Sequence, residues 1–205
     1  MSTSLRVISN LSLSKTEVLK NKDLLVEKLN SIGKTIPNSS LIKNQKKWTY
    51  EITGFNNDNL YLLKDSSPYI EFFDFSEISW FYISIYPECI ILNSSLHYAD
   101  LYRKFERDVF LELPFQYEEL KAFRTEIYQL ISVFGGSEII YLADNDCNKL
   151  NNYLNKIEEG VGYDEIKEQM KNDGTTIVRK YDQLDSAKLD YRKITAYFFD
   201  DLVDV

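Results

Sequence analysis

The chain has 205 residues, and its 24 Lys and Arg residues against 32 Asp and Glu residues give a formal net charge of −8 at pH 7. Apolar residues make up 44% of the chain and charged residues 27%, as in ordinary globular proteins, so disordered and collagen-like classes are excluded. The length fits a single domain over residues 1–205, with possible lobes at 1–93 (sheet-rich) and 94–205 (helix-rich).

The chain contains few residues of the types that usually carry catalysis or bind metals, with two cysteines and one histidine. Cys89 and Cys147 form no C-x-x-C pair, so neither a zinc site nor a disulfide framework is indicated, although one disulfide between them stays open. His97 is the only histidine, which excludes a His-rich metal site and leaves no other residue to serve as the usual proton carrier of a nucleophile-base triad. We therefore expect no catalytic residue, no metal and no cofactor.

Neither a membrane nor a nucleic acid is expected as a partner. The chain begins without the apolar segment of a signal peptide, and no run approaches the ~20 apolar residues of a membrane-spanning helix. This favours a soluble, cytoplasmic protein. The only basic cluster is Lys43, Lys46 and Lys47 beside Trp48, and the negative net charge repels a phosphate backbone.

The first 47 residues predict a strand and a helix. A short β-favouring run covers Leu5–Ile8. Ser14 and Glu17 have the spacing of a capping box, in which each side chain binds an orphan amide at a helix start. The helix that follows has Gly33 as its left-handed closing residue. Its apolar stripe is Val18, Leu25, Leu29 and Ile32.

From Trp48 the hydrophobic period changes from 3.6 to 2. Trp48, Tyr50 and Ile52 alternate with polar residues, which predicts a half-buried strand. The turn residues of Gly54–Asn59 then predict a hairpin. Further short β-favouring runs lie at 60–64, 69–75, 78–86 and 90–92. Their connections are too short for crossover helices, so antiparallel pairing is predicted.

The helical period returns at about Ser94. The expected elements are helices at 98–109 and 120–134 (closed by Gly135 and Gly136), a buried strand at 138–143, helices at 150–157 and 163–170 (closed by Gly160 and Gly174), and strands at 175–181 and 189–199. The predicted fold class is α+β, with an antiparallel central sheet at about 48–92, an N-terminal helix, and a C-terminal helical section with returning strands.

Charge is unevenly distributed along the chain. Residues 1–47 carry a net charge of +6, and residues 48–205 carry −14. Residues 48–100 combine eight acidic residues with a single basic one, Lys64, and hold 13 of the 29 aromatic residues. This is more aromatic side chains than one face of a sheet needs, so we expect them on both faces.

The acidic, aromatic segment has two interpretations. In the first, its aromatic side chains fill the core and its carboxylates face water, as in half-exposed antiparallel sheets. In the second, aromatic side chains rimmed by carboxylates bind a basic protein partner. The candidate partner-binding residues are Glu71, Asp74, Glu77, Trp80 and Tyr82.

Two other functions stay open. Asp144 and Asp146 lie where a predicted strand meets a predicted helix, so they fit either a Mg²⁺-assisted hydrolase or simple caps of that helix. The acidic end of the chain, with Asp200, Asp201 and Asp204, fits an adaptor or structural subunit.

The chain also resembles a known class of proteins, and this resemblance favours the partner-binding function while the other two stay open. The acidic, aromatic block from Trp48 to Tyr86 and the segments Phe134–Asp144 and Tyr163–Ile166 carry it. In these features the chain resembles the immunity proteins that are paired with bacterial polymorphic toxins. The resemblance implies a small, acidic α+β protein without catalytic residues that neutralises a cognate toxin by binding it. We therefore predict a non-enzymatic immunity-type inhibitor of a basic toxin domain.

Overall fold

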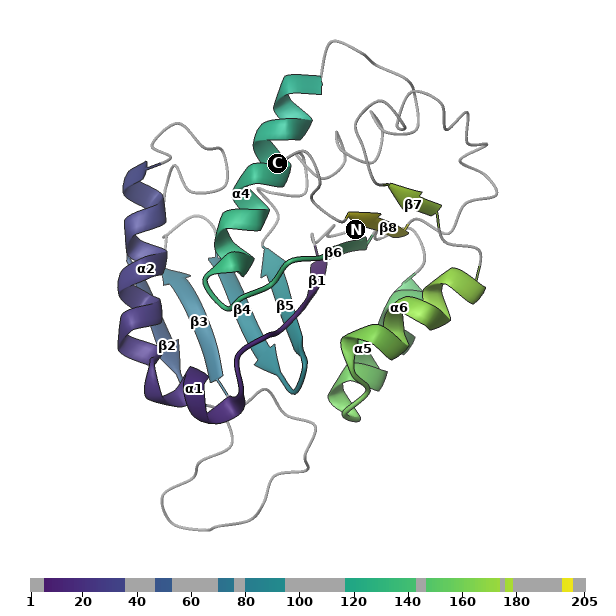
Figure 1. Ribbon diagram of the computed structural model, residues 1–205, viewed down its shortest axis with the longest axis horizontal. Coiled ribbons are helices and arrows are strands. Elements are labelled where there is room, and N and C mark those ends of the chain that lie inside the picture. The colour runs from purple at the N-terminus through teal and green to yellow at the C-terminus, as the bar shows by residue number, and fades with distance from the viewer. Residues whose placement is uncertain are drawn as a thin grey trace.

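The computed structural model describes residues 6–35, 47–52, 70–75, 80–94, 117–142, 147–173, 176–178 and 197–200, which form an α+β fold (Figure 1). The strands are β1 (Arg6–Asn10), β2 (Trp48–Glu51), β3 (Ile70–Phe75), β4 (Trp80–Tyr86), β5 (Cys89–Ser94), β6 (Ile139–Leu142), β7 (Thr176–Val178) and β8 (Tyr197–Asp200). The helices are α1 (Lys15–Lys20), α2 (Lys22–Thr35), α4 (Tyr117–Ser132), α5 (Cys147–Glu158) and α6 (Tyr163–Asn172).

The strands form one sheet in the order β2-β3-β4-β5-β1-β6-β8-β7. Neighbouring strands are antiparallel except β7 and β8, which are parallel. The predicted antiparallel sheet over residues 48–92 is confirmed in β2 to β5. β1 lies inside the sheet between β5 and β6, and its Val7, Ile8 and Ser9 are all buried, as expected of a strand that is covered on both faces.

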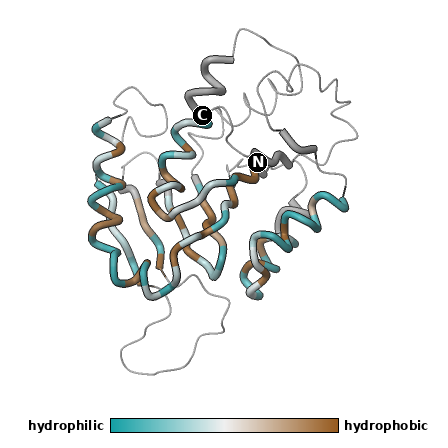
Figure 2. The backbone as a smooth tube through the Cα atoms, viewed as in Figure 1, coloured by the Kyte–Doolittle hydropathy of each residue, from teal (hydrophilic) through white to brown (hydrophobic). Residues whose placement is uncertain are grey.

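Two apolar cores lie on opposite faces of the sheet. On the first face, α1, α2 and α4 cover strand residues such as Trp48, Phe72 and Leu92. On the second face, α5 and α6 cover Ile8, Ile91 and neighbouring residues of β1, β5 and β6. In Figure 1, α2 and α4 run along the sheet while α5 and α6 lie to the right, and Figure 2 shows hydrophobic and hydrophilic residues interspersed along the coloured part of α5 and α6.

The first helical segment differs from its prediction in one respect. The capping box is confirmed, because Glu17 N donates to Ser14 Oγ (3.3 Å) and Ser14 N donates to Glu17 Oε2 (2.8 Å). The single helix that the stripe predicted is instead two helices, which meet at Asn21, with φ −97° and ψ 9°. Gly33 lies inside α2, which continues to Thr35, so its predicted role as closing residue is wrong.

Two later glycines close their helices as predicted. Gly135 follows α4 with φ 78°, and Gly160 follows α5 with φ 92°. At each end the amide after the glycine reaches back five residues, from Gly136 N to Ile131 O (3.1 Å) and from Val161 N to Lys156 O (2.9 Å). This is the Schellman arrangement, which needs a left-handed residue.

Several predictions concern residues outside the described ranges. These are the turn at 54–59, the strand at 60–64, the helix at 98–109 with His97, the closing Gly174, Asp144 and Asp146, and most of the strand at 189–199. Within the described ranges, Ile52 was expected on the buried side of its strand. It follows the last residue of β2 instead and is 36% exposed.

Candidate functional site

One row of residues crosses the second face of the sheet from an apolar end to an acidic end. The strand register pairs Ile140 with Ile8, Ile8 with Ile91, and Ile91 with Ser84. It then pairs Ser84 with Glu71, and Glu71 with Glu51. The three isoleucines are buried with α5 and α6, whereas Glu71 is half-buried and Glu51 is exposed. The same face of one sheet therefore changes from core to polar surface over β4, β3 and β2.

We call the polar end of this face the acidic-aromatic patch, which consists of Glu51, Glu71, Phe73, Tyr82 and Ser84. Glu51 and Glu71 are directly opposite each other on neighbouring strands, which places their Cβ atoms about 5 Å apart. Ser84 is buried, and its hydroxyl donates to Glu71 Oε1 (2.9 Å). The hydroxyl is thereby satisfied, and it holds one oxygen of the Glu71 carboxylate in place.

The aromatic part of the patch is the pair Phe73 and Tyr82. These two residues are directly opposite on β3 and β4, and their ring centroids are 6.1 Å apart with an interplanar angle of 43°. Burial raises the pKa of Tyr82, the negative charge of Glu71 raises it further, and Arg6 opposes the shift. The Tyr82 hydroxyl is thus neutral at physiological pH and close enough to Glu71 to respond to its charge.

The five sequence-predicted partner-binding residues are distributed differently from expectation. The structure brings Glu71 and Tyr82 together in the patch. Asp74 and Trp80 are described through their backbone only, where Asp74 pairs with Trp48 and Phe81, and Trp80 pairs with Phe75. Glu77 lies outside the described residues.

Glu51 belongs to the patch and was not among the predicted residues. The period-2 alternation from Trp48 onward had placed Glu51 on the polar side of its strand. The alternation does not reveal which strand lies opposite Glu51. Its partner Glu71 is 20 residues further along the chain.

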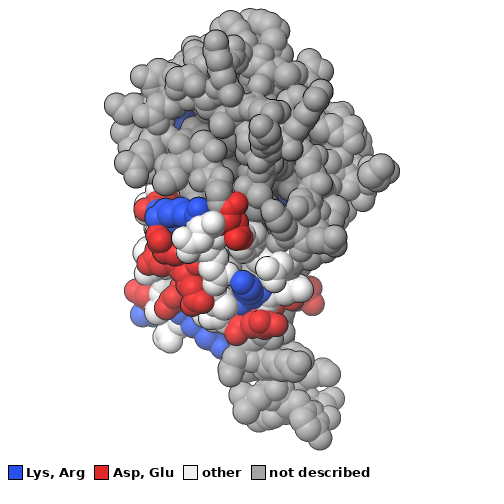
Figure 3. All heavy atoms as spheres, turned by 90° about the vertical axis from the view of Figure 1, so that its right-hand side faces the viewer, with Lys and Arg blue, Asp and Glu red and all other residues white. Residues whose placement is uncertain are grey.

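A second acidic surface lies where α5 turns into α6. Its exposed carboxylates are Glu88, Glu158, Glu159, Asp164 and Glu165. Glu88 reaches this surface from the β4–β5 turn, where it has φ 60°, and its carboxylate lies against Gly162, the residue before α6. Figure 3 views the side that carries α5 and α6, where acidic side chains cover more of the described surface than basic ones. The negative charge near the start of α6 interacts favourably with the positive end of its helix dipole.

Lysines of α5 and α6 are engaged with neighbouring side chains. Lys167 forms an ion pair with Glu138, and Lys171 forms one with Glu168. Lys156 Nζ donates to Gln169 Oε1 (2.6 Å). The carboxylates at the α5–α6 turn are therefore not neutralised by these cations.

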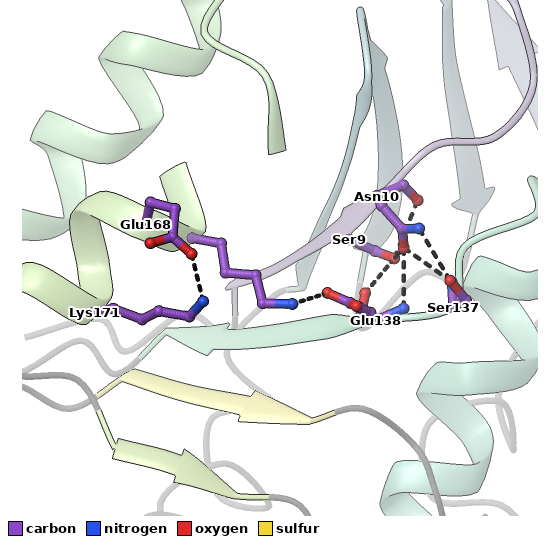
Figure 4. Close-up of polar contacts among 7 residues, drawn as sticks. Ser9, Asn10, Ser137, Glu138, Glu168 and Lys171 are labelled. Atoms are coloured by element: carbon purple, nitrogen blue, oxygen red, sulfur yellow. Dashed lines mark hydrogen bonds and ion pairs between the residues drawn. The ribbon is translucent and has the colours of Figure 1, made fainter. Parts of the chain in front are cut away.

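A polar junction holds the start of β6 to the end of β1 (Figure 4). Asn10 Oδ1 accepts hydrogen bonds from Ser137 N (2.9 Å) and Glu138 N (3.0 Å), and Ser9 Oγ donates to Glu138 O (2.7 Å). The Glu138 side chain carries the ion pair to Lys167 of α6. These contacts join the backbones of β1 and β6 and satisfy the hydroxyl of the buried Ser9, so the junction is structural.

Comparison of the chain with protein-family models, with curated proteins and with solved structures found no match.

The described residues contain no metal-binding cluster and no membrane-spanning helix. None of their His, Cys, Asp and Glu side chains form a group of three or more that could hold a metal ion. No helix in the described ranges is long and apolar enough to cross a membrane. Cys89 is fully buried, and burial, with smaller contributions from Glu88 and Asp164, raises its thiol pKa to about 12. A thiol with that pKa is a poor nucleophile at neutral pH.

Proposed function

We propose that this protein is a non-enzymatic binding protein, an immunity-type inhibitor that neutralises a basic toxin domain. The observation that carries the proposal is the acidic-aromatic patch, where two directly opposed glutamates lie beside Phe73 and Tyr82 on a sheet face. Aromatic side chains supply much of the binding energy of protein interfaces, and carboxylates around them select a basic partner.

The charge of the whole chain supports the same kind of partner. The net charge of −8 attracts a positively charged protein over a distance of about one Debye length and so raises the association rate. The toxin part of the proposal is supported by the resemblance of the acidic, aromatic segment to immunity proteins of polymorphic toxins.

A binding measurement tests the proposal. The probe is the C-terminal domain of a polymorphic toxin encoded beside the gene for this protein, and association is followed by surface plasmon resonance. We expect tight binding whose association rate falls at least about tenfold between roughly 20 mM and 500 mM salt, because screening shortens the reach of the charges. No complex at low salt would contradict the toxin-inhibitor function.

The face that binds is tested with two charge-reversal variants. Changing Glu51 and Glu71 to Lys should slow association at least about tenfold, because it reverses the charge of the acidic-aromatic patch. The matched control changes Glu158 and Glu159 to Lys, which alters the net charge equally on the α5–α6 surface. An association rate that falls only in the control would place the partner on α5 and α6 instead.

A further inference from the structure

We propose that the Glu51 and Glu71 pair of the acidic-aromatic patch binds the guanidinium group of one arginine of the partner protein. This inference rests on the proposed function, because it names the chemical group by which a basic partner would be recognised. The proposed ligand of the patch is one arginine side chain on the surface of a basic protein.

The register of the two glutamates favours a bound cation. Glu51 and Glu71 are directly opposite on β2 and β3, and like charges in that position repel each other. Neither has an ion-pair partner in the part of the chain that the structure describes. Ser84 binds only Oε1 of Glu71, and a hydroxyl donor does not neutralise the charge. A cation between the two carboxylates would remove this repulsion.

The shape of the guanidinium group suits two neighbouring carboxylates. A guanidinium group is planar and carries five N–H donors, so one arginine can bond to both carboxylates at once. A lysine ammonium group is a compact, strongly hydrated charge that gains less from two acceptors at this spacing. The pair therefore favours arginine.

The aromatic rings of the patch lie next to the carboxylate pair along the strands. Phe73 and Tyr82 are the next residues of the same face along β3 and β4, two positions from Glu71 and Ser84. Guanidinium groups stack on aromatic rings, whereas ammonium groups make a weaker contact of this kind. The carboxylates of the α5–α6 turn have no such paired register, and they supply the matched control.

The experiment uses blocked tetra-arginine and tetra-lysine peptides as probes of the ¹⁵N-labelled full chain. We expect tetra-arginine to bind about tenfold more tightly than tetra-lysine and to shift the amide resonances of Glu51, Glu71 and Tyr82 most. The double variant Glu51→Gln, Glu71→Gln should weaken tetra-arginine binding at least about tenfold. Glutamine at position 71 keeps an acceptor for the Ser84 hydroxyl, so the fold is retained, and urea unfolding verifies this.

The control variant Glu158→Gln, Glu159→Gln removes the same charge from the α5–α6 turn. We expect it to change tetra-arginine binding by less than about twofold, because screened charges on a distant surface contribute little to a short-range contact. Equal binding of the two peptides, or shifts centred on residues 158–165, would overturn the arginine site.

The two proposals fail in different ways. If the toxin domain binds and the Glu51→Gln, Glu71→Gln variant binds it equally well, the arginine site is wrong while the inhibitor function stands. If tetra-arginine binds as expected and no toxin domain binds, the inhibitor function is wrong while the arginine site stands.

Discussion

At the scale of single residues, backbone conformation explains which glycines the chain needs. Gly135 and Gly160 both adopt a left-handed conformation after a helix. Their surroundings differ, because a Cβ at Gly160 would meet open space, whereas a Cβ at Gly135 would collide with Ser12 Oγ and lie 3.1 Å from Ser12 Cβ. The Ser12 hydroxyl can rotate away, but its Cβ cannot, so the contact adds to the conformational cost.

This difference leads to a prediction about stability. Gly160→Ala should lower the free energy of unfolding by about 1–2 kcal/mol, the cost of a left-handed non-glycine residue. Gly135→Ala should cost roughly 1 kcal/mol more because of the contact with Ser12. Urea unfolding measures both. In a Ser12→Gly background, Gly135→Ala should cost about as much as Gly160→Ala does, because the contact with Ser12 is gone. Equal costs of Gly135→Ala and Gly160→Ala in the unmodified chain would contradict the role of this contact.

At the scale of elements, the attachment of α5 and α6 to the sheet depends on apolar contacts more than on charge. Tyr153, Ile157, Tyr163, Ile166 and Met170 are buried in the second core. The ion pair between Lys167 and Glu138 is partly exposed, with 23% and 36% of the two side chains accessible. Partly exposed ion pairs are worth about 0–1 kcal/mol, whereas a buried isoleucine truncated to alanine costs about 2–5 kcal/mol.

Two substitutions test this ranking. Ile166→Ala should lower the free energy of unfolding by about 2–5 kcal/mol, because it leaves a cavity under α6. Lys167→Gln, one residue away, should cost less than about 1 kcal/mol. Amide hydrogen exchange in α5 and α6 reports the attachment directly. A larger loss of protection in Lys167→Gln than in Ile166→Ala would show that the ion pair dominates.

At the scale of the whole molecule, the two cores share strands. Val7 of β1 belongs to the first core and Ile8 to the second, and Ile139 and Ile140 of β6 divide in the same way. β1 also pairs with β5 and β6, which joins strands from before and after residue 94 in one sheet. That residues 1–205 form a single domain stays a prediction. The strands shared by the two cores support it, because they join both layers in one sheet.

Cooperative unfolding is the expected consequence. In a Trp80→Phe, Cys147→Ser background, the fluorescence of buried Trp48 reports the first core and the reactivity of the buried Cys89 thiol reports the second. We expect both probes to give the same urea midpoint, because neither core can open without disrupting the strands that the other packs against. Two separate midpoints would indicate that the layers unfold independently.

How much could be predicted from the sequence depends on the range of the interaction. The capping box of Ser14 and Glu17 and the helix end at Gly135 were predicted correctly, because three or four neighbouring residues determine them. The break at Asn21 was missed, since a continuous apolar stripe does not distinguish one helix from two joined by a single residue.

The sequence by itself determined the fold class, the helix ends that depend on local hydrogen bonds, and the concentration of acidic and aromatic residues between 48 and 100. Only the tertiary structure decided that β1 lies inside the sheet and that Glu51 is opposite Glu71. The reason is physical: periodicity sets which side of a strand a residue occupies, but the partner strand is selected by packing between segments far apart in the chain. Among the described residues of 48–100, the register places the carboxylates of Glu51 and Glu71 on one face with Phe73 and Tyr82.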